Sequence, residues 1–363
     1  MNALLPRPGV LDISPYVPGE SRVPGFENPV KLASNESPLG PSPSVAEAIS
    51  AKFDKLHLYP DPDAVDLRGA IGRAYEIDAG NVICTAGSEQ LLHLIARAYA
   101  GPGDEIFYPQ YGFLAYPLAA KGAGAMPVEA PQSAEHTDVD VLLNHVTART
   151  KVLFLANPNN PTGTWLPATE IRRLREGLPS SVLLVIDEAY AEYSNAPDYE
   201  SALSMVEGDN ANVVVTRTFS KIFGLAALRV GWGYCPPSVI DVLKRVRYSF
   251  AVTTPAQVAA VAALGDKDHI ARAKAHNDTW LPWVAANLEK LGIKVTPSLG
   301  NFVLAHFPGD SEGARAADSH LRSDGIIVRP MAGYGLPQCL RITIGTEAEN
   351  KKLIESLKNF RAR

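Results

Sequence analysis

Short apolar runs alternate with longer helical patterns along most of the chain. Several of these runs are continuously apolar, which is typical of strands buried on both faces of a sheet. The predicted strands cover residues 81–85, 104–108, 151–155, 181–186 and 212–216. Helical patterns, such as that of residues 88–99, lie between them. Strands that alternate with helices predict an α/β fold with a mainly parallel sheet.

The C-terminal third of the chain has a different pattern. A long helical stretch covers residues 236–291, with breaks near residues 253–255 and at Gly265. Shorter predicted strands follow at residues 294–296, 301–306, 326–329 and 340–344. Helical patterns between and after these strands complete a smaller α+β domain.

The first thirty residues contain six prolines and predict an extended arm without a core of its own. Such an arm must lie on the rest of its subunit or on a neighbouring one. We therefore expect an arm at residues 1–30, a large domain at residues 31–265 and a small domain at residues 266–363.

Composition narrows the class of protein. The chain has 363 residues, enough for roughly two domains at about 150 residues each. The 34 basic and 39 acidic residues give a net charge of -5, which argues against a strongly basic nucleic-acid binder. The longest apolar run, residues 258–264, is far shorter than the roughly 20 residues of a membrane helix, so we expect no membrane partner.

The cysteines and histidines bear on the compartment and on metal binding. Cys84, Cys235 and Cys339 are odd in number and far apart, which argues against a disulfide framework and favours a reducing compartment. The eight histidines show no spacing typical of a metal site. The sequence therefore predicts a cytoplasmic enzyme without a metal ion.

Polar residues follow four of the predicted strands at the point where each strand ends. Asn157 follows the strand at 151–155, and Asp187 closes the strand at 181–186. Lys221 comes shortly after the strand at 212–216. In an open parallel sheet, ligands bind beyond the carboxyl ends of the strands. We expect these side chains to share one site at that edge of the sheet.

Several residues in this set suit a phosphate group. Gly87 and Ser88 open a helix, whose free N–H groups and dipole favour an anion. Thr218 and Ser220 add hydroxyl groups, and Arg229 adds a cation that can hold phosphate with two hydrogen bonds.

The remaining groups suit a ring nitrogen and an aldehyde. A carboxylate such as Asp187, at the end of an apolar strand, is costly to bury unless a cation compensates it, and a protonated ring nitrogen is such a cation. Lys221 lies among small and apolar residues, where desolvation and nearby cations lower the pKa of a lysine and make it a Schiff-base nucleophile. Phosphate, ring nitrogen and aldehyde together describe pyridoxal phosphate.

Three segments resemble the fold-type I aminotransferases of class I and II. They are Asn-Pro-Asn-Asn-Pro-Thr-Gly at 157–163, Asp-Glu-Ala-Tyr at 187–190 and the lysine segment at 218–229. Two more segments, at residues 31–43 and 58–62, resemble the histidinol-phosphate branch of that family. The resemblance spans nearly the whole chain. It implies a large domain with a mainly parallel sheet, a smaller α+β domain and pyridoxal 5'-phosphate as cofactor.

The resemblance also implies roles for residues around the cofactor ring. Lys221 would link to the cofactor aldehyde and later move the proton between substrate Cα and cofactor C4'. Asp187 would keep the pyridine nitrogen protonated. Asn157 and Tyr190 would hydrogen-bond the phenolic oxygen, and Tyr111 would stack on the ring.

At the phosphate, the resemblance implies ligands from both subunits of a homodimer with shared active sites. Tyr59 would reach the phosphate bound in the neighbouring subunit. The ligands from the same subunit would be Gly87, Ser88, Thr218, Ser220 and Arg229.

For the substrate, the resemblance implies a small-molecule amino donor and a keto acceptor. Arg341 would hold the α-carboxylate, and Asn35 would approach that end of the site. Tyr16 and Arg329 would face the rest of the substrate, with Arg329 near its phosphate. The implied reaction, a step of histidine biosynthesis, converts histidinol phosphate and 2-oxoglutarate into imidazole acetol phosphate and glutamate.

One stretch departs from the pattern of the branch. Residues 249–253 read Ser-Phe-Ala-Val-Thr, where the branch usually carries Pro-Tyr-Asn-x-Asn. Both asparagines are absent, so an aromatic amino acid aminotransferase on the same scaffold is an alternative. More distant alternatives are a pyridoxal-phosphate lyase or decarboxylase and an aminotransferase-like transcription regulator.

Overall fold

A seven-stranded sheet forms the centre of the larger part of the molecule in the computed structural model, which describes residues 6, 9–13, 20–132, 135–206 and 212–362. The strand order is β2-β8-β7-β6-β5-β3-β4, and β8 alone in this sheet runs antiparallel to its neighbours. The strands are β2 (Val82–Thr85), β3 (Glu105–Pro109), β4 (Met126–Ala130), β5 (Thr150–Ala156), β6 (Leu183–Asp187), β7 (Val213–Thr218) and β8 (Gly231–Tyr234).

All five strands predicted for this sheet are confirmed, with ends that differ by no more than two residues. The pattern missed β4 and β8 for different reasons. Strand β4 contains Pro127 and Glu129 and is only partly buried, so its sequence lacks an apolar run. Strand β8 reads Gly-Trp-Gly-Tyr, and glycine is normally depleted in strands.

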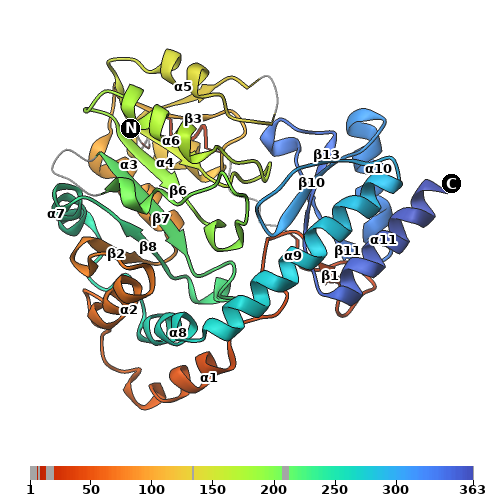
Figure 1. The fold of residues 1–363 in the computed structure, drawn as a ribbon, viewed down its shortest axis with the longest axis horizontal. Coiled ribbons are helices and arrows are strands. Elements are labelled where there is room, and N and C mark those ends of the chain that lie inside the picture. Colours follow the sequence, from red (N-terminus) through yellow and green to blue (C-terminus); the bar gives the residue numbers. More distant parts are fainter. Residues whose placement is uncertain (1–5, 7–8, 14–19, 133–134, 207–211, 363) are drawn as a thin grey trace, which may run out of the picture.

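Helices cover both faces of the seven-stranded sheet (Figure 1). Alternate residues of β5 and β6 enter opposite apolar clusters, which explains their continuous hydrophobicity. On one face lie α3 (Ser88–Tyr99), α4 (Ala115–Ala123) and α7 (Pro237–Val246). On the other lie α1 (Pro43–Ser50), α2 (Val65–Tyr75), α5 (Val139–His145), α6 (Ala168–Gly177) and α8 (Thr254–Gly265).

The smaller part contains a four-stranded antiparallel sheet in the order β12-β13-β10-β9. Its strands are β9 (Lys294–Thr296), β10 (Phe302–His306), β12 (Arg329–Pro330) and β13 (Cys339–Thr343). Helices α10 (Asp310–Ser323) and α11 (Glu347–Arg361) share an apolar cluster with this sheet. The strands predicted here are confirmed except at residues 326–329, where a single strand was wrong.

That stretch contains two short strands instead of one. Strand β11 (Ile326–Ile327) pairs in parallel with β1 (Val30–Lys31) of the arm, whereas β12 pairs with β13. Pairing with β1 therefore separates Ile326 and Ile327 from the longer strand that the local sequence predicts.

The helical stretch expected at residues 236–291 consists of α7, α8 and α9 (Lys267–Lys290). The second break follows Gly265 as predicted, whereas the first covers residues 247–253 and so begins earlier than the predicted 253–255. The side chain of Thr253 caps α8, and that of Asp266 caps α9. Helix α9 runs from beside α8 to the small sheet (Figure 1), and it contributes Ala273 to one core cluster and Leu288 to another. The division at residue 265 stays a prediction.

No helix in the described part of the chain combines the length and the hydrophobicity that a membrane crossing requires.

A buried ion-pair network lies next to Asp187, the residue with which β6 ends. Arg217 on β7 is bonded to Glu188 at 2.7 Å and to Glu192 at 2.8 Å. Glu188 also accepts hydrogen bonds from the hydroxyl of Ser201 and the backbone N–H of Ala202. These bonds tie β7 to the segment that follows β6.

We expect Arg217→Ala to lower the free energy of unfolding by about 3–5 kcal/mol, because it leaves two carboxylates buried without their cation. Urea unfolding of the cofactor-free protein measures this loss. The matched control is Arg172→Ala, which breaks an exposed pair with Glu200 and should cost no more than about 1 kcal/mol. Similar losses in both variants would contradict the role of the network.

Candidate functional site

A cavity of about 310 Å³ lies where the strands β5, β6 and β7 end, between the two sheets. Its volume is within the range of about 300–1,000 Å³ that is typical of small-molecule sites. Ten of the residues predicted for the site line it: Asn35, Ser88, Asp187, Tyr190, Thr218, Ser220, Lys221, Arg229, Arg329 and Arg341.

Asp187 is the last residue of β6, and only 6% of it is exposed. The strand register places it opposite Thr216, whose hydroxyl donates a hydrogen bond to the carboxylate at 3.0 Å. The hydroxyl of Tyr116 donates a longer one at 3.5 Å. Burial raises the pKa of Asp187 to about 6. The carboxylate is thus mostly ionised at neutral pH, and it lacks a cationic partner among the groups that bond it here.

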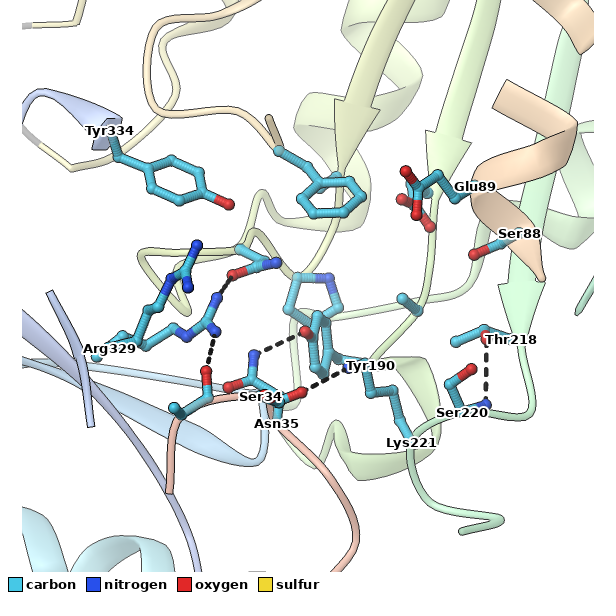
Figure 2. A pocket seen from close by; sticks show the side chains of 18 of the residues that line it. Ser34, Asn35, Ser88, Glu89, Tyr190, Thr218, Ser220, Lys221, Arg329 and Tyr334 are labelled. Carbon is cyan, nitrogen blue, oxygen red and sulfur yellow. Dashed lines mark hydrogen bonds between the residues drawn. The ribbon is translucent and has the colours of Figure 1, made fainter. Parts of the chain in front are cut away.

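Lys221 lies in the turn after β7 and points into the same cavity (Figure 2). Its Nζ donates a hydrogen bond to the backbone carbonyl of Ser34 at 3.3 Å. Burial, and after it the charges of Arg341 and Arg229, lower the pKa of Lys221 to about 7. A large fraction of this amine is therefore neutral and nucleophilic at physiological pH.

Tyr190 lies beside Lys221, whose Nζ is 5.7 Å from the centroid of the tyrosine ring. Asn35 donates a hydrogen bond to the Tyr190 hydroxyl at 2.9 Å. Asn35 has a positive φ of 54° and is held in place by Thr343, which bonds both its backbone N–H and its side chain. Burial raises the pKa of Tyr190 to about 12, so its hydroxyl is protonated at neutral pH.

Hydroxyl groups gather at one end of the cavity. Figure 2 shows Ser88, Thr218 and Ser220 together on one side of Lys221, and Arg229 also lines the cavity. Ser88 is the first residue of α3, so it adds a helix N-terminus. A Cβ at Gly87 would lie 2.8 Å from Nη2 of Arg229, so glycine permits the close approach of the guanidinium.

Two arginines lie at the other end. Arg329 on β12 and Arg341 on β13 are directly opposite each other in the strand register. Arg341 is buried, and its guanidinium donates hydrogen bonds to Asn160 and to the backbone carbonyl of Ala33. Its Nε has no hydrogen-bond partner within the described residues. This end therefore carries two positive charges that favour an anion.

Three consecutive residues that follow β1, residues 33–35, contact three of these functional side chains. The backbone carbonyl of Ala33 accepts from Arg341, and that of Ser34 accepts from Lys221. Asn35 donates to Tyr190. The segment 33–35 thus holds the lysine, the tyrosine and one arginine on the same side of the cavity.

Five predicted site residues lie elsewhere, and their roles stay predictions. Gly87 adjoins Ser88 but does not line the cavity, and Asn157 uses its side chain to bond both backbone groups of Leu166. Tyr59 is 81% exposed. Tyr111 packs against an apolar cluster of the small sheet. Tyr16 lies outside the described residues.

Other residues reach the site without having been predicted. Thr216 could have been found from the strand register and Asn160 from its place in the segment 157–163. No sequence signal pointed to Tyr116, Phe113 or Tyr334. The hydroxyl of Tyr334 faces the cavity from the same end as Arg329 (Figure 2).

The fold, together with a lysine and a carboxylate that converge on one cavity, is typical of a pyridoxal-phosphate enzyme. Comparison with known proteins gives the family. The family model described as aminotransferase class I and II matches residues 27–357. The chain therefore belongs to the class I and II aminotransferase family, and the expected fold-type I architecture is confirmed.

The similar proteins narrow the resemblance. A histidinol-phosphate aminotransferase of Paramagnetospirillum magneticum is 54% identical over 361 residues, which is 99% of each chain. Another, from Maricaulis maris, is 50% identical over 360 residues and 99% of each chain. The crystal structure of histidinol-phosphate aminotransferase from Sinorhizobium meliloti in complex with pyridoxal-5'-phosphate has a TM-score of 0.87 and 28% identity, and the match covers 98% of each chain.

The lowered pKa of Lys221 predicts a pH-dependent stability difference. Below about pH 7 the folded protein must bury a charged ammonium, whereas the unfolded chain holds the same proton up to about pH 10.4. The free energy of unfolding of the wild type, relative to Lys221→Met, should therefore rise with pH above 7, by at most about 1.4 kcal/mol per pH unit. Urea unfolding of both cofactor-free proteins between pH 6 and 9 measures it. A difference that stays flat or falls would show that Lys221 keeps its proton in the folded state.

Proposed function

We propose that the chain catalyses amino transfer from histidinol phosphate to 2-oxoglutarate with pyridoxal 5'-phosphate, giving imidazole acetol phosphate and glutamate. The observation that carries this proposal is the single cavity that contains Lys221 and Asp187 between two anion-binding ends. Similarity over 99% of the chain to proteins named histidinol-phosphate aminotransferase supports it. The same similarity argues against the aromatic aminotransferase alternative.

The residues present fit the cofactor. The hydroxyl end, with Arg229, suits its phosphate, and the buried carboxylate of Asp187 suits its protonated ring nitrogen. Tyr190 and Asn157 are the proposed donors to its phenolic oxygen. When bound, the cofactor supplies an aldehyde for the substrate amine and a ring that accepts the electrons of the broken Cα–H bond.

Lys221 is the proposed base and acid of the reaction. Its pKa of about 7 lets it accept and return a proton near neutral pH. The carbonyl of Ser34 accepts a hydrogen bond from Nζ when the amine is free and so orients it. Arg341 and Arg229 disfavour the charged form of the amine, so they help to keep Lys221 ready to take the proton from Cα.

The two arginines give the substrate end a role for each of the two substrates. Arg341, with its unpaired Nε, would hold the α-carboxylate of glutamate. Histidinol phosphate has no carboxylate on that carbon, and its phosphate is the group we assign to Arg329. Because the two residues face each other on β12 and β13, one end of the cavity can serve both substrates.

A homodimer is the proposed assembly. Large apolar side chains are exposed on the segment around Tyr59, and clusters of this kind are typical of protein interfaces. They are Phe53, Leu56, Leu58, Tyr59 and Val65. A second copy of the chain that covers them would also bring Tyr59 to the neighbouring site. We also propose a cytoplasmic location, because the three cysteines are buried and free.

Lys221→Ala should abolish the covalent link to the cofactor, because no other lysine lines the cavity among the residues that the structure describes. Borohydride reduction of the holoenzyme, followed by peptide mass spectrometry, should find a phosphopyridoxyl group on Lys221 in the wild type and none at that site in the variant. Lys351→Ala, which removes an exposed lysine of α11, is the control and should keep the adduct. An undiminished adduct in Lys221→Ala would refute the assignment.

Arg329→Ala should lower kcat/KM for histidinol phosphate by roughly 10- to 100-fold, because a charged hydrogen bond to phosphate is worth about 1.5–3 kcal/mol. The single-turnover reaction with glutamate should change far less. Arg315→Ala, an exposed arginine of α10, is the control. Equal losses for both substrates would contradict the proposed contact between Arg329 and the phosphate.

A comparison of substrates with the wild type tests the aromatic alternative. Faster turnover of phenylalanine than of histidinol phosphate, each with 2-oxoglutarate, would favour that alternative.

A further inference from the structure

The segment that departs from the family pattern, residues 249–253, lies against Tyr59. The rings of Phe250 and Tyr59 are stacked, with centroids 4.5 Å apart and an interplanar angle of 18°. Both rings are largely accessible in the single chain, Tyr59 at 81% and Phe250 at 44%. Two exposed aromatic rings in face-to-face contact form a projecting pair on the surface.

The backbone next to Tyr59 is fixed by the same region of the chain. Arg247 donates a hydrogen bond to the carbonyl of Pro62 at 2.7 Å and pairs with Asp63 at 2.6 Å. Gln257, which is buried, donates to the carbonyls of Asp61 and Val252, both at 2.9 Å. Residues 247–257 therefore hold the loop at 61–63 through hydrogen bonds and an ion pair, while the ring of Phe250 stacks on the ring of Tyr59.

An exposed tyrosine that must reach a neighbouring molecule loses rotamer freedom when it binds. That loss costs roughly 0.5–1.5 kcal/mol for a side chain that was free beforehand. A stacked neighbour restricts the ring in advance and so lowers this cost.

We propose that Phe250 is a positioning residue: its ring holds Tyr59 in the orientation from which the tyrosine hydroxyl reaches the cofactor phosphate in a second copy of the chain. This inference rests on the proposed function and on the proposed homodimer. It gives position 250, which is aromatic both here and in the pattern of the branch, a task that does not need the two missing asparagines.

The test measures the dissociation constant of pyridoxal 5'-phosphate from the dimer. Phe250→Ala should raise it about 2- to 10-fold, the equivalent of one aromatic pair. Phe250→Tyr keeps a ring and should restore the wild-type constant. Tyr59→Phe keeps the stack but removes the hydroxyl, so adding Phe250→Ala to Tyr59→Phe should cause no further rise.

Tyr248→Ala is the matched control, since Tyr248 is a 63% exposed aromatic residue two positions from Phe250. It should leave the constant unchanged. The proposal is overturned if Phe250→Ala binds the cofactor as the wild type does, or if it weakens binding equally without the Tyr59 hydroxyl. It is also overturned if Phe250→Ala sediments as a monomer, because Phe250 would then act by packing the interface. A wild type that binds no cofactor would instead refute the proposed function.

Discussion

The cost of burying charge governs the structure around the cavity. Asp187 and Lys221 are opposite in charge, but each is desolvated, and their pKa values move toward each other, to about 6 and about 7. Neither residue has its charge fully balanced by the protein. A ligand that brings a ring cation to the carboxylate and an aldehyde to the amine relieves both costs at once. The site is in this sense complementary to a molecule with two separate functional groups at a fixed spacing.

The rest of the fold places anion-binding groups on either side of that pair. The hydroxyl end combines the start of α3 with the turn after β7, whereas the arginine end comes from β12 and β13 of the small sheet. The two ends thus belong to different sheets with different apolar clusters. In the proposed function, the large sheet would thus hold the cofactor, while the small sheet would provide the groups for the substrate.

Much of this could be predicted from the sequence, because it depends on local pattern. Helix α3 has the predicted bounds, and Asp187 and Lys221 could be found from the ends of apolar runs. What could not be predicted depends on tertiary proximity. Strand β8 contains two glycines, so its sequence does not predict a strand, and it forms because it pairs with β2 and β7. Strand β11 forms because it pairs with β1. Phe113 reaches the cavity from a loop and Tyr334 from a three-residue 3-10 helix, and no periodicity in the sequence indicates either position. Asn157 shows what a motif leaves open, since its amide bonds both backbone groups of Leu166 and its role toward the cofactor stays a prediction.

The contacts of the segment 33–35 determine which substitutions its backbone bonds can tolerate. Two of its three contacts, those with Arg341 and Lys221, use main-chain oxygens, which every amino acid carries. Substitution at residues 33 and 34 therefore preserves these bonds as long as the backbone keeps its path. That path depends on β1 and on the left-handed conformation of Asn35, so these two bonds depend on chain geometry and not on the chemistry of the side chains at 33 and 34.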